Sequence, residues 1–304
     1  MIVLPVDKYM ERLRLMSQFE GRDYGRLRIL EQAQEDFRDR ATALRGFTAI
    51  SAAFKCFFLE TVELLNSEIR PRIKSAVSPE YAMFLPRLCS HFFTLCGAER
   101  CAMGGYPLEG YTILRNVFDG AVMTAAAAMR ISDFYAIEGL AAQEPFDPGK
   151  VRTRRKKEEF RVRALMTGKD SGLSALTLEE LAKWDALFDM EIHGAGLSKA
   201  KAMNWMRGKG PLPVVPTYLE RDFSMFINRY CEIAWVIHRL IPMIQPPGIL
   251  FDSFWREKWQ RLDESLEQAV ASLTQDLGKK IGAAVVELVK TKFAFTAESV
   301  LAPG

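Results

Sequence analysis

Residues 107–139 read PLEGYTILRNVFDGAVMTAAAAMRISDFYAIEG and hold the longest uninterrupted helical pattern in the chain. Their apolar side chains recur three and four residues apart, at Leu114, Phe118, Ala121, Ala125 and Ala128. This spacing is typical of a helix with one face in a protein core. The alanine run that ends at Ala128 offers only methyl groups, so a neighbouring helix can approach closely there. We therefore predict that this helix is central to the fold.

Glycine and proline mark the start of this helix. Gly104 and Gly105 end the helix before it. Pro107 suits the first turn of the next helix, where its missing N–H would have had no partner in any case. The sequence therefore predicts a helical hairpin around these residues.

Arg115 and Asp119 stand one turn apart on the edge of the apolar stripe. At that spacing the two side chains can pair with each other, and Tyr111 and Phe118 are placed to shield them from water. Two interpretations are open. The pair is an ordinary intrahelical ion pair at the margin of a core, which is the commoner case, or it belongs to a functional site, where perturbed charges gather.

The composition is that of a globular protein without a strong charge of either sign. Of its 304 residues 49% are hydrophobic, which is enough for a large core. Lys and Arg number 41 against 38 for Asp and Glu. The net charge of +3 creates no general attraction for nucleic acid or anionic lipid. Any such binding must therefore be local.

The sequence shows no sign of export or of a membrane span. The N-terminal residues MIVLPVDKYMERLRL lack the pattern of a signal peptide. The most lipid-like segment, residues 47–59, contains Lys55 and is too short to cross a bilayer. The five cysteines form no CxxC pair and lie mostly in apolar helical surroundings. We predict a cytoplasmic protein with reduced core cysteines and no membrane partner.

Helical spacing recurs along the chain, and no segment has the alternation and hairpin turns of strands. We predict an all-α fold, a bundle of about seven to eight long helices. Residues 1–20 form a short helix or arm. Residues 21–207 form the main helical bundle, with one long helix over residues 27–70. Residues 208–304 form a C-terminal helical hairpin that packs on the bundle or on a second chain.

Two stretches of the C-terminal part have apolar residues at heptad spacing. The first runs from Leu219 to Leu240. The second runs from Trp255 to Leu288 in one long terminal helix, bent near Gly278 and Gly282. Such stripes pack lengthwise against another helix. Because they offer more apolar surface than a few neighbouring helices readily cover, we predict a homodimer. Another protein is an alternative partner.

The run KVRTRRKKEEFRVR, residues 150–163, contains eight basic and two acidic residues. We predict an exposed surface helix here. A solvated charged face is the favoured interpretation and an RNA contact is the alternative, since Phe160 is the only ring nearby. RNA is therefore an open partner but not the favoured one. The side chains that would contact RNA phosphates are Arg152, Arg154, Arg155, Lys156 and Lys157.

Sequence motifs that would indicate a particular chemistry are absent. No GxGxxG, GxxxxGK[ST], GxSxG, HExxH or EF-hand loop occurs. Four residues could suggest zinc but cannot share one helix face, namely Cys89, His91, Cys96 and Cys101. We therefore predict no bound metal and no cofactor.

His193 has the most suggestive setting of the three histidines, because Asp185, Asp189 and His193 follow one another at intervals of four. A carboxylate beside an imidazole orients it and raises its pKa, which suits a general acid or base. A histidine in the last turn of a helix also stabilises the helix C-terminus without any chemistry. This structural role is the favoured interpretation, and catalysis is the alternative.

A resemblance rests on GYTILRNVFDG, residues 110–120, and on the later EIHGAG, residues 191–196. Together they resemble a family of uncharacterised bacterial all-helical domains, in which a similar Arg and acidic residue precede a later His-Gly. The chain is also distantly similar to HEPN helical bundles, which are nucleotide-binding or RNA-cleaving domains of bacterial toxin and phage-defence systems. Their mark is an Arg followed by a polar residue and a His four to six residues further on. Arg115 has no such histidine, so a HEPN-like activity requires Arg115 and His193 to meet in space.

Three functions fit these patterns. The favoured hypothesis is an interaction or sensing protein without catalysis, which the resemblance associates with a bacterial defence or toxin system. The second is a metal-independent ribonuclease or nucleotide-modifying enzyme that uses Arg115, Asp119 and His193. It predicts that His193 comes within reach of the other two side chains. The third is a small-molecule binder whose pocket lies between the central helix and its neighbours.

Overall fold

The computed structural model describes residues 25–42, 45–72, 79–129, 147–192, 206–208, 218–245, 251–272 and 276–294. Within these ranges the chain forms nine α-helices and no strand, which confirms the predicted all-α class. The helices are α2 (Gly25–Thr42), α3 (Arg45–Leu64), α4 (Pro79–Met103), α5 (Pro107–Ala128), α7 (Pro148–Thr167), α8 (Ala175–Ile192), α10 (Glu220–Leu240), α11 (Ser253–Ser272) and α12 (Asp276–Lys292). His193 and the predicted arm, residues 1–20, lie outside the described residues.

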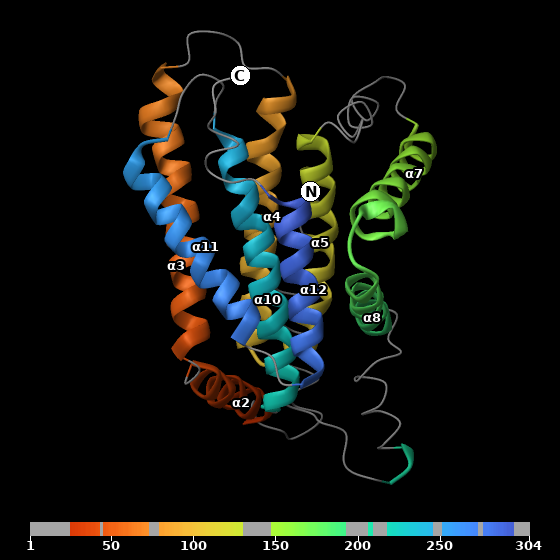
Figure 1. Ribbon diagram of the computed structural model, residues 1–304. Helices are drawn as coiled ribbons and strands as arrows, with labels where there is room; N and C mark the ends of the chain where they lie inside the picture. The colour runs from red at the N-terminus through yellow and green to blue at the C-terminus, as the bar shows by residue number, and fades with distance from the viewer. Residues whose placement is uncertain are drawn as a thin grey trace.

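Helices α3, α4, α5, α10, α11 and α12 form one bundle, with α2 across one end and α7 and α8 beside α5 (Figure 1). Helix α5 contacts α4 and α10 on its bundle side and α7 and α8 on its flank. One cluster of buried apolar side chains extends from Phe37 to Phe293 and includes residues of all nine helices. Among the described helices none combines the length and the apolar character that a bilayer span requires.

Helix α10 is deeply enclosed in the bundle. The helix predicted to be central, residues 107–139, is described up to Met129 and contacts α4, α7, α8 and α10 as α5. Every residue from 229 to 242 is buried. Helix α5 contacts α7 and α8 through its charged edge, and α8 also packs on α12. The apolar stripes of α10, α11 and α12 are covered inside one chain. The homodimer, which was inferred from those stripes, stays a prediction.

Two predicted long helices are each divided in two. The predicted helix over residues 27–70 contains α2 and α3, which point in different directions, and a π-helical turn at Leu65–Ile69 after α3 (Figure 1). The predicted terminal helix consists of α11 and α12, which pack side by side. Lys290 of α12 forms an ion pair with Glu267 of α11, although a continuous helix would hold them about 35 Å apart. In the sequence the apolar spacing stays nearly in phase from α2 to α3 and from α11 to α12, which is why periodicity does not separate the two helices of each pair.

The predicted hairpin between α4 and α5 is confirmed. Gly105 adopts a φ of 98°, which residues with a side chain rarely do, and Pro107 is the first residue of α5. A Cβ atom on Gly110 would lie only 2.7 Å from the carbonyl oxygen of Ala98. Helices α4 and α5 therefore approach closely at this glycine, and the polar edge of α5 faces away toward α7 and α8.

The cysteines are only partly core residues. Cys231 is buried, whereas Cys56 is exposed and the other three are half-buried. Burial raises the thiol pKa of Cys89, and it also raises that of Cys96. These two side chains are therefore neutral thiols at physiological pH.

Candidate functional site

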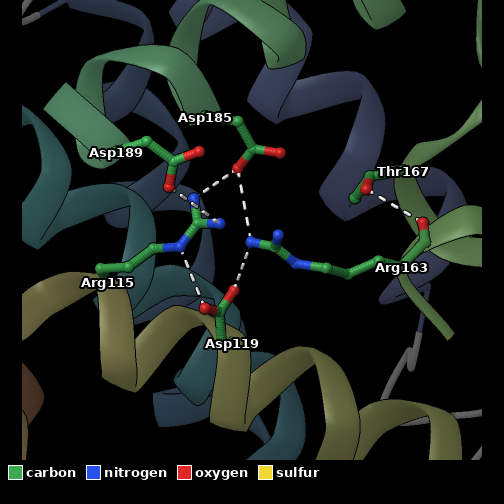
Figure 2. A network of polar contacts seen from close by, with 6 residues as sticks. All are labelled: Arg115, Asp119, Arg163, Thr167, Asp185 and Asp189. Carbon is green, nitrogen blue, oxygen red and sulfur yellow. Dashed lines mark hydrogen bonds and ion pairs between the residues drawn. The ribbon is translucent and has the colours of Figure 1, made fainter. Parts of the chain in front are cut away.

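Five charged side chains from three helices meet on the flank of α5 (Figure 2). They are Arg115 and Asp119 of α5, Arg163 of α7, and Asp185 and Asp189 of α8, and we call them the charge cluster. Arg115 lies at its centre. Its Nε is 3.0 Å from Asp119 Oδ2 and its Nη1 is 2.5 Å from Asp185 Oδ1. Its Nη2 is 3.9 Å from Asp189 Oδ1.

Arg115 is buried, with only 4% of its surface exposed. Its guanidinium also lies over the ring of Phe188, 5.5 Å from the ring centroid, which is a favourable cation–π distance. Burial by itself lowers the pKa of Arg115, but the carboxylates of Asp119 and Asp185 raise it on balance. The side chain therefore stays charged, and its donors are directed at carboxylates of its own chain.

Arg163 joins the charge cluster from α7. Its Nη2 lies 2.8 Å from Asp119 Oδ1 and 3.6 Å from Asp185 Oδ1. Asp119 therefore lies between two guanidinium groups, as Figure 2 shows. Partial burial raises the pKa of Asp119 to about 6; Arg115 opposes this rise and the Asp185 carboxylate adds to it. Asp119 can thus gain or lose a proton near physiological pH.

The structure brings together residues that the sequence had placed in separate features. The pairing of Arg115 with Asp119 is confirmed, and Asp185 and Asp189 approach the same arginine from α8. His193 follows these aspartates but lies outside the described residues, so its reach to the cluster stays a prediction. Sequence analysis missed the role of Arg163 because it is one of eight basic residues in a single run.

A cavity of about 770 Å³ adjoins the charge cluster, between α4, α5 and α7. This volume lies within the range of small-molecule sites in proteins. Asp119 and Arg163 belong both to the cluster and to the cavity wall. The remaining lining residues are Arg87, Ser90, His91, Asn116, Gly120, Val122, Met123, Arg155, Lys156, Glu159 and Phe160.

Among its described residues, the cavity wall carries more positive than negative charge. These cations are Arg87, Arg155, Lys156 and Arg163, and the carboxylates are Asp119 and Glu159, which leaves an excess of two positive charges in the described part of the wall. Both carboxylates are already engaged, since Arg155 Nε lies 2.8 Å from Glu159 Oε1 and Arg163 holds Asp119. Lys156 is exposed and has no ion-pair partner within the described ranges. The wall is therefore suited to an anion.

His91 contributes a neutral imidazole to the cavity wall. Its Nε2 lies 2.9 Å from Thr124 Oγ1, and the Thr124 hydroxyl in turn donates to the carbonyl oxygen of Gly120. Because a hydroxyl has one proton, Nε2 must be the protonated donor and Nδ1 is left as an acceptor. Burial lowers the pKa of His91 to about 4, and the charge of Arg87 adds to this. Gly120 makes room for the ring, since a Cβ there would lie 2.5 Å from His91 Cε1.

The basic residues of α7 divide into two groups. Residues 152–157 are exposed, as the sequence predicted for a surface helix. Arg155 and Lys156 line the cavity, whereas Arg152, Arg154 and Lys157 do not. A solvated charged face stays the favoured interpretation of these five residues, and an RNA contact stays the alternative.

Comparisons of this chain with protein-family models, curated proteins and solved structures find no match. The similarity to HEPN domains therefore stays a prediction from the sequence. Within the part of the chain that the structure describes, no group of three or more His, Cys, Asp or Glu side chains is arranged to hold a metal ion.

Proposed function

We propose that this protein is a helical sensor that binds a small anionic ligand, such as a phosphorylated compound, in the cavity between α4, α5 and α7. The observation that carries the proposal is the excess of positive charge on the wall of a cavity of ligand size. It unites two hypotheses from the sequence, a sensing role without catalysis and a pocket beside the helix at 107–139.

The chemistry of the wall supports a ligand with a charged and an apolar part. Arg155 and Arg163 are eight residues apart on α7, which separates them by about 12 Å along the helix. Ser90 and Asn116 can hydrogen-bond a polar ligand, and Phe160 offers an exposed ring at the wall. Such a distribution of cations suits an elongated ligand with more than one negative group.

The enzymatic alternative finds less support at Arg115. A group that stabilises developing charge on phosphate needs donors that face the substrate. The donors of Arg115 face Asp119, Asp185 and Asp189 instead. Arg163 lines the cavity and is the better candidate for contact with phosphate. A ribonuclease that uses Arg115, Asp119 and His193 stays an untested alternative.

The proposal is tested by isothermal titration calorimetry with inorganic phosphate, pyrophosphate and nucleotides. Binding to the parent protein should weaken about three- to tenfold in Lys156→Gln, because one charge-assisted contact at a partly exposed site is lost. Arg154→Gln is the matched control, since Arg154 is an exposed cation of the same helix outside the cavity wall. Binding of none of these anions, or an equal loss in both variants, would contradict the proposal.

A further inference from the structure

Arg163 connects the cavity with the charge cluster. It lines the cavity and binds Asp119 and Asp185 through the same nitrogen, Nη2. Its side chain is 37% exposed, whereas that of Arg115 is 5% exposed. Arg163 is therefore the arginine of the cluster that a ligand in the cavity can reach.

We propose that an anion in the cavity competes with Asp119 and Asp185 for Arg163, so that ligand binding loosens α7 from α5 and α8. This inference rests on the proposed function and gives it a means of regulation. The ligand and the two aspartates bind the same guanidinium, so each weakens the hold of the other. Such coupling is reciprocal by thermodynamic necessity.

Helix α7 is suited to be the part that moves. Of its twenty residues, Pro148–Thr167, only Val162 and Met166 are buried. Few apolar contacts hold such a helix, so its polar contacts have a large share in fixing its position. Helix α8, in contrast, buries Leu181, Trp184 and Phe188 in the core. A weakened cluster should therefore shift α7 before it shifts α8.

The charge balance of the cluster sets the direction of the effect. Two arginines face three aspartates. When a ligand engages Arg163, Asp119 and Asp185 lose part of their compensation and repel each other more strongly. Conversely, removing the charge of Asp185 makes Arg163 a stronger partner for the ligand.

Asp185 and Asp189 provide a matched pair of variants for the test, with inorganic pyrophosphate as the probe. Both are on α8 and both contact Arg115, but only Asp185 lies near Arg163, at 3.6 Å. In Asp185→Asn we expect pyrophosphate affinity to rise about three- to tenfold at low salt. In Asp189→Asn, one helical turn further away, the rise should stay below about twofold because of screening.

The role of Arg163 itself is tested in an Arg163→Gln background, where Asp185→Asn should no longer raise the affinity. An undiminished rise in that background would show that the effect does not pass through Arg163 and would overturn the inference. Should Arg163→Gln bind too weakly to measure, the comparison of Asp185→Asn with Asp189→Asn decides. Equal changes of pyrophosphate affinity in the two variants overturn the coupling, and a larger rise in Asp185→Asn supports it. If the parent protein does not bind pyrophosphate, the inference is overturned. If it binds none of inorganic phosphate, pyrophosphate and nucleotides, the proposed function is overturned as well.

Discussion

Replacing Arg115 by Met removes the cation that contacts all three aspartates of the charge cluster. Methionine keeps an unbranched apolar side chain against Phe188, so the substitution leaves no large cavity. Its effect on stability should therefore come mainly from the loss of charge compensation. This makes Arg115→Met a direct measure of what the cluster contributes to folding.

The expected loss is about 2 kcal/mol of unfolding free energy. Removing one partner of a fully buried ion pair costs about 3–5 kcal/mol. In this cluster the side chains of Asp119 and Asp185 are 40% and 38% exposed, so water can hydrate their carboxylates once Arg115 is gone. Arg163 continues to compensate Asp119 at 2.8 Å. Both effects reduce the cost to below that of a buried pair.

The loss should shrink as the pH falls from 7.5 to 5. A carboxyl whose pKa is raised from 3.8 to about 6, as in Asp119, contributes stability that is fully present below pH 3.8 and disappears as the pH rises through 6. Arg115 opposes this rise, so the pKa of Asp119 should be still higher in Arg115→Met. Near neutral pH the ionised carboxylate of Asp119 then lowers the unfolding free energy of the variant more than that of the parent. At pH 5 Asp119 is mostly protonated in both proteins, so the difference between their unfolding free energies is smaller.

Urea unfolding followed by circular dichroism at the two pH values measures both effects. Arg161→Met on α7 is the control, because Arg161 is an exposed arginine paired with Glu158 and should change stability by less than about 0.5 kcal/mol. Unfolding free energies of Arg115→Met within about 0.5 kcal/mol of the parent at both pH values would refute the argument. A difference that widens at pH 5 would refute it as well.

Three further outcomes are expected. Gly120→Ala should lower stability by about 1 kcal/mol in thermal unfolding, because the new Cβ displaces His91 at a cost larger than the gain in helix propensity; an unchanged melting temperature would contradict this. Glu287→Gln should cost about 1 kcal/mol at pH 7, since Glu287 accepts hydrogen bonds from Ser174 at the start of α8. The pKa of Glu287 is lowered by its hydrogen bonds, so this loss should vanish in acid as the pH falls through that pKa; a loss that persists in acid would speak against it. Filter binding should detect no salt-sensitive RNA affinity. A salt-sensitive affinity that disappears when the basic residues among 152–157 are replaced by Gln would instead favour the nucleic-acid hypothesis.

The helices and the first half of the charge cluster could be predicted from the sequence because both depend on local spacing. The stripe from Leu114 to Ala125 follows from helical periodicity and is buried as expected. The pairing of Arg115 with Asp119 follows from one turn of helix. In each case the partners lie within a few residues, so the chain itself defines the geometry.

A pocket beside the helix at 107–139 was one of the hypotheses from the sequence, but the residues of its wall could not be predicted because they depend on how α7 packs against α4 and α5. Nothing local marks His91 as part of a cavity wall, and nothing local distinguishes Arg163 from the other basic residues of its run. What separates Arg163 is its contact with Asp119, 44 residues away in the sequence. Asp185 is likewise 70 residues from Arg115. Such pairs follow from tertiary packing and leave no periodic signal.

The use of charge where α7 meets the bundle bears on function. Apolar groups of similar size often hold a partly buried interface as firmly as an ion network, or more firmly by about 1–4 kcal/mol. Stability alone therefore does not require two arginines and three aspartates between α5, α7 and α8. A charged contact has one property that an apolar contact lacks, because the anionic group of a ligand can take the place of a carboxylate at Arg163. Contacts of Arg163 with the aspartates can then be replaced by contacts with the ligand at a small net change in free energy. Helix α7 can shift when this happens, because it buries only Val162 and Met166.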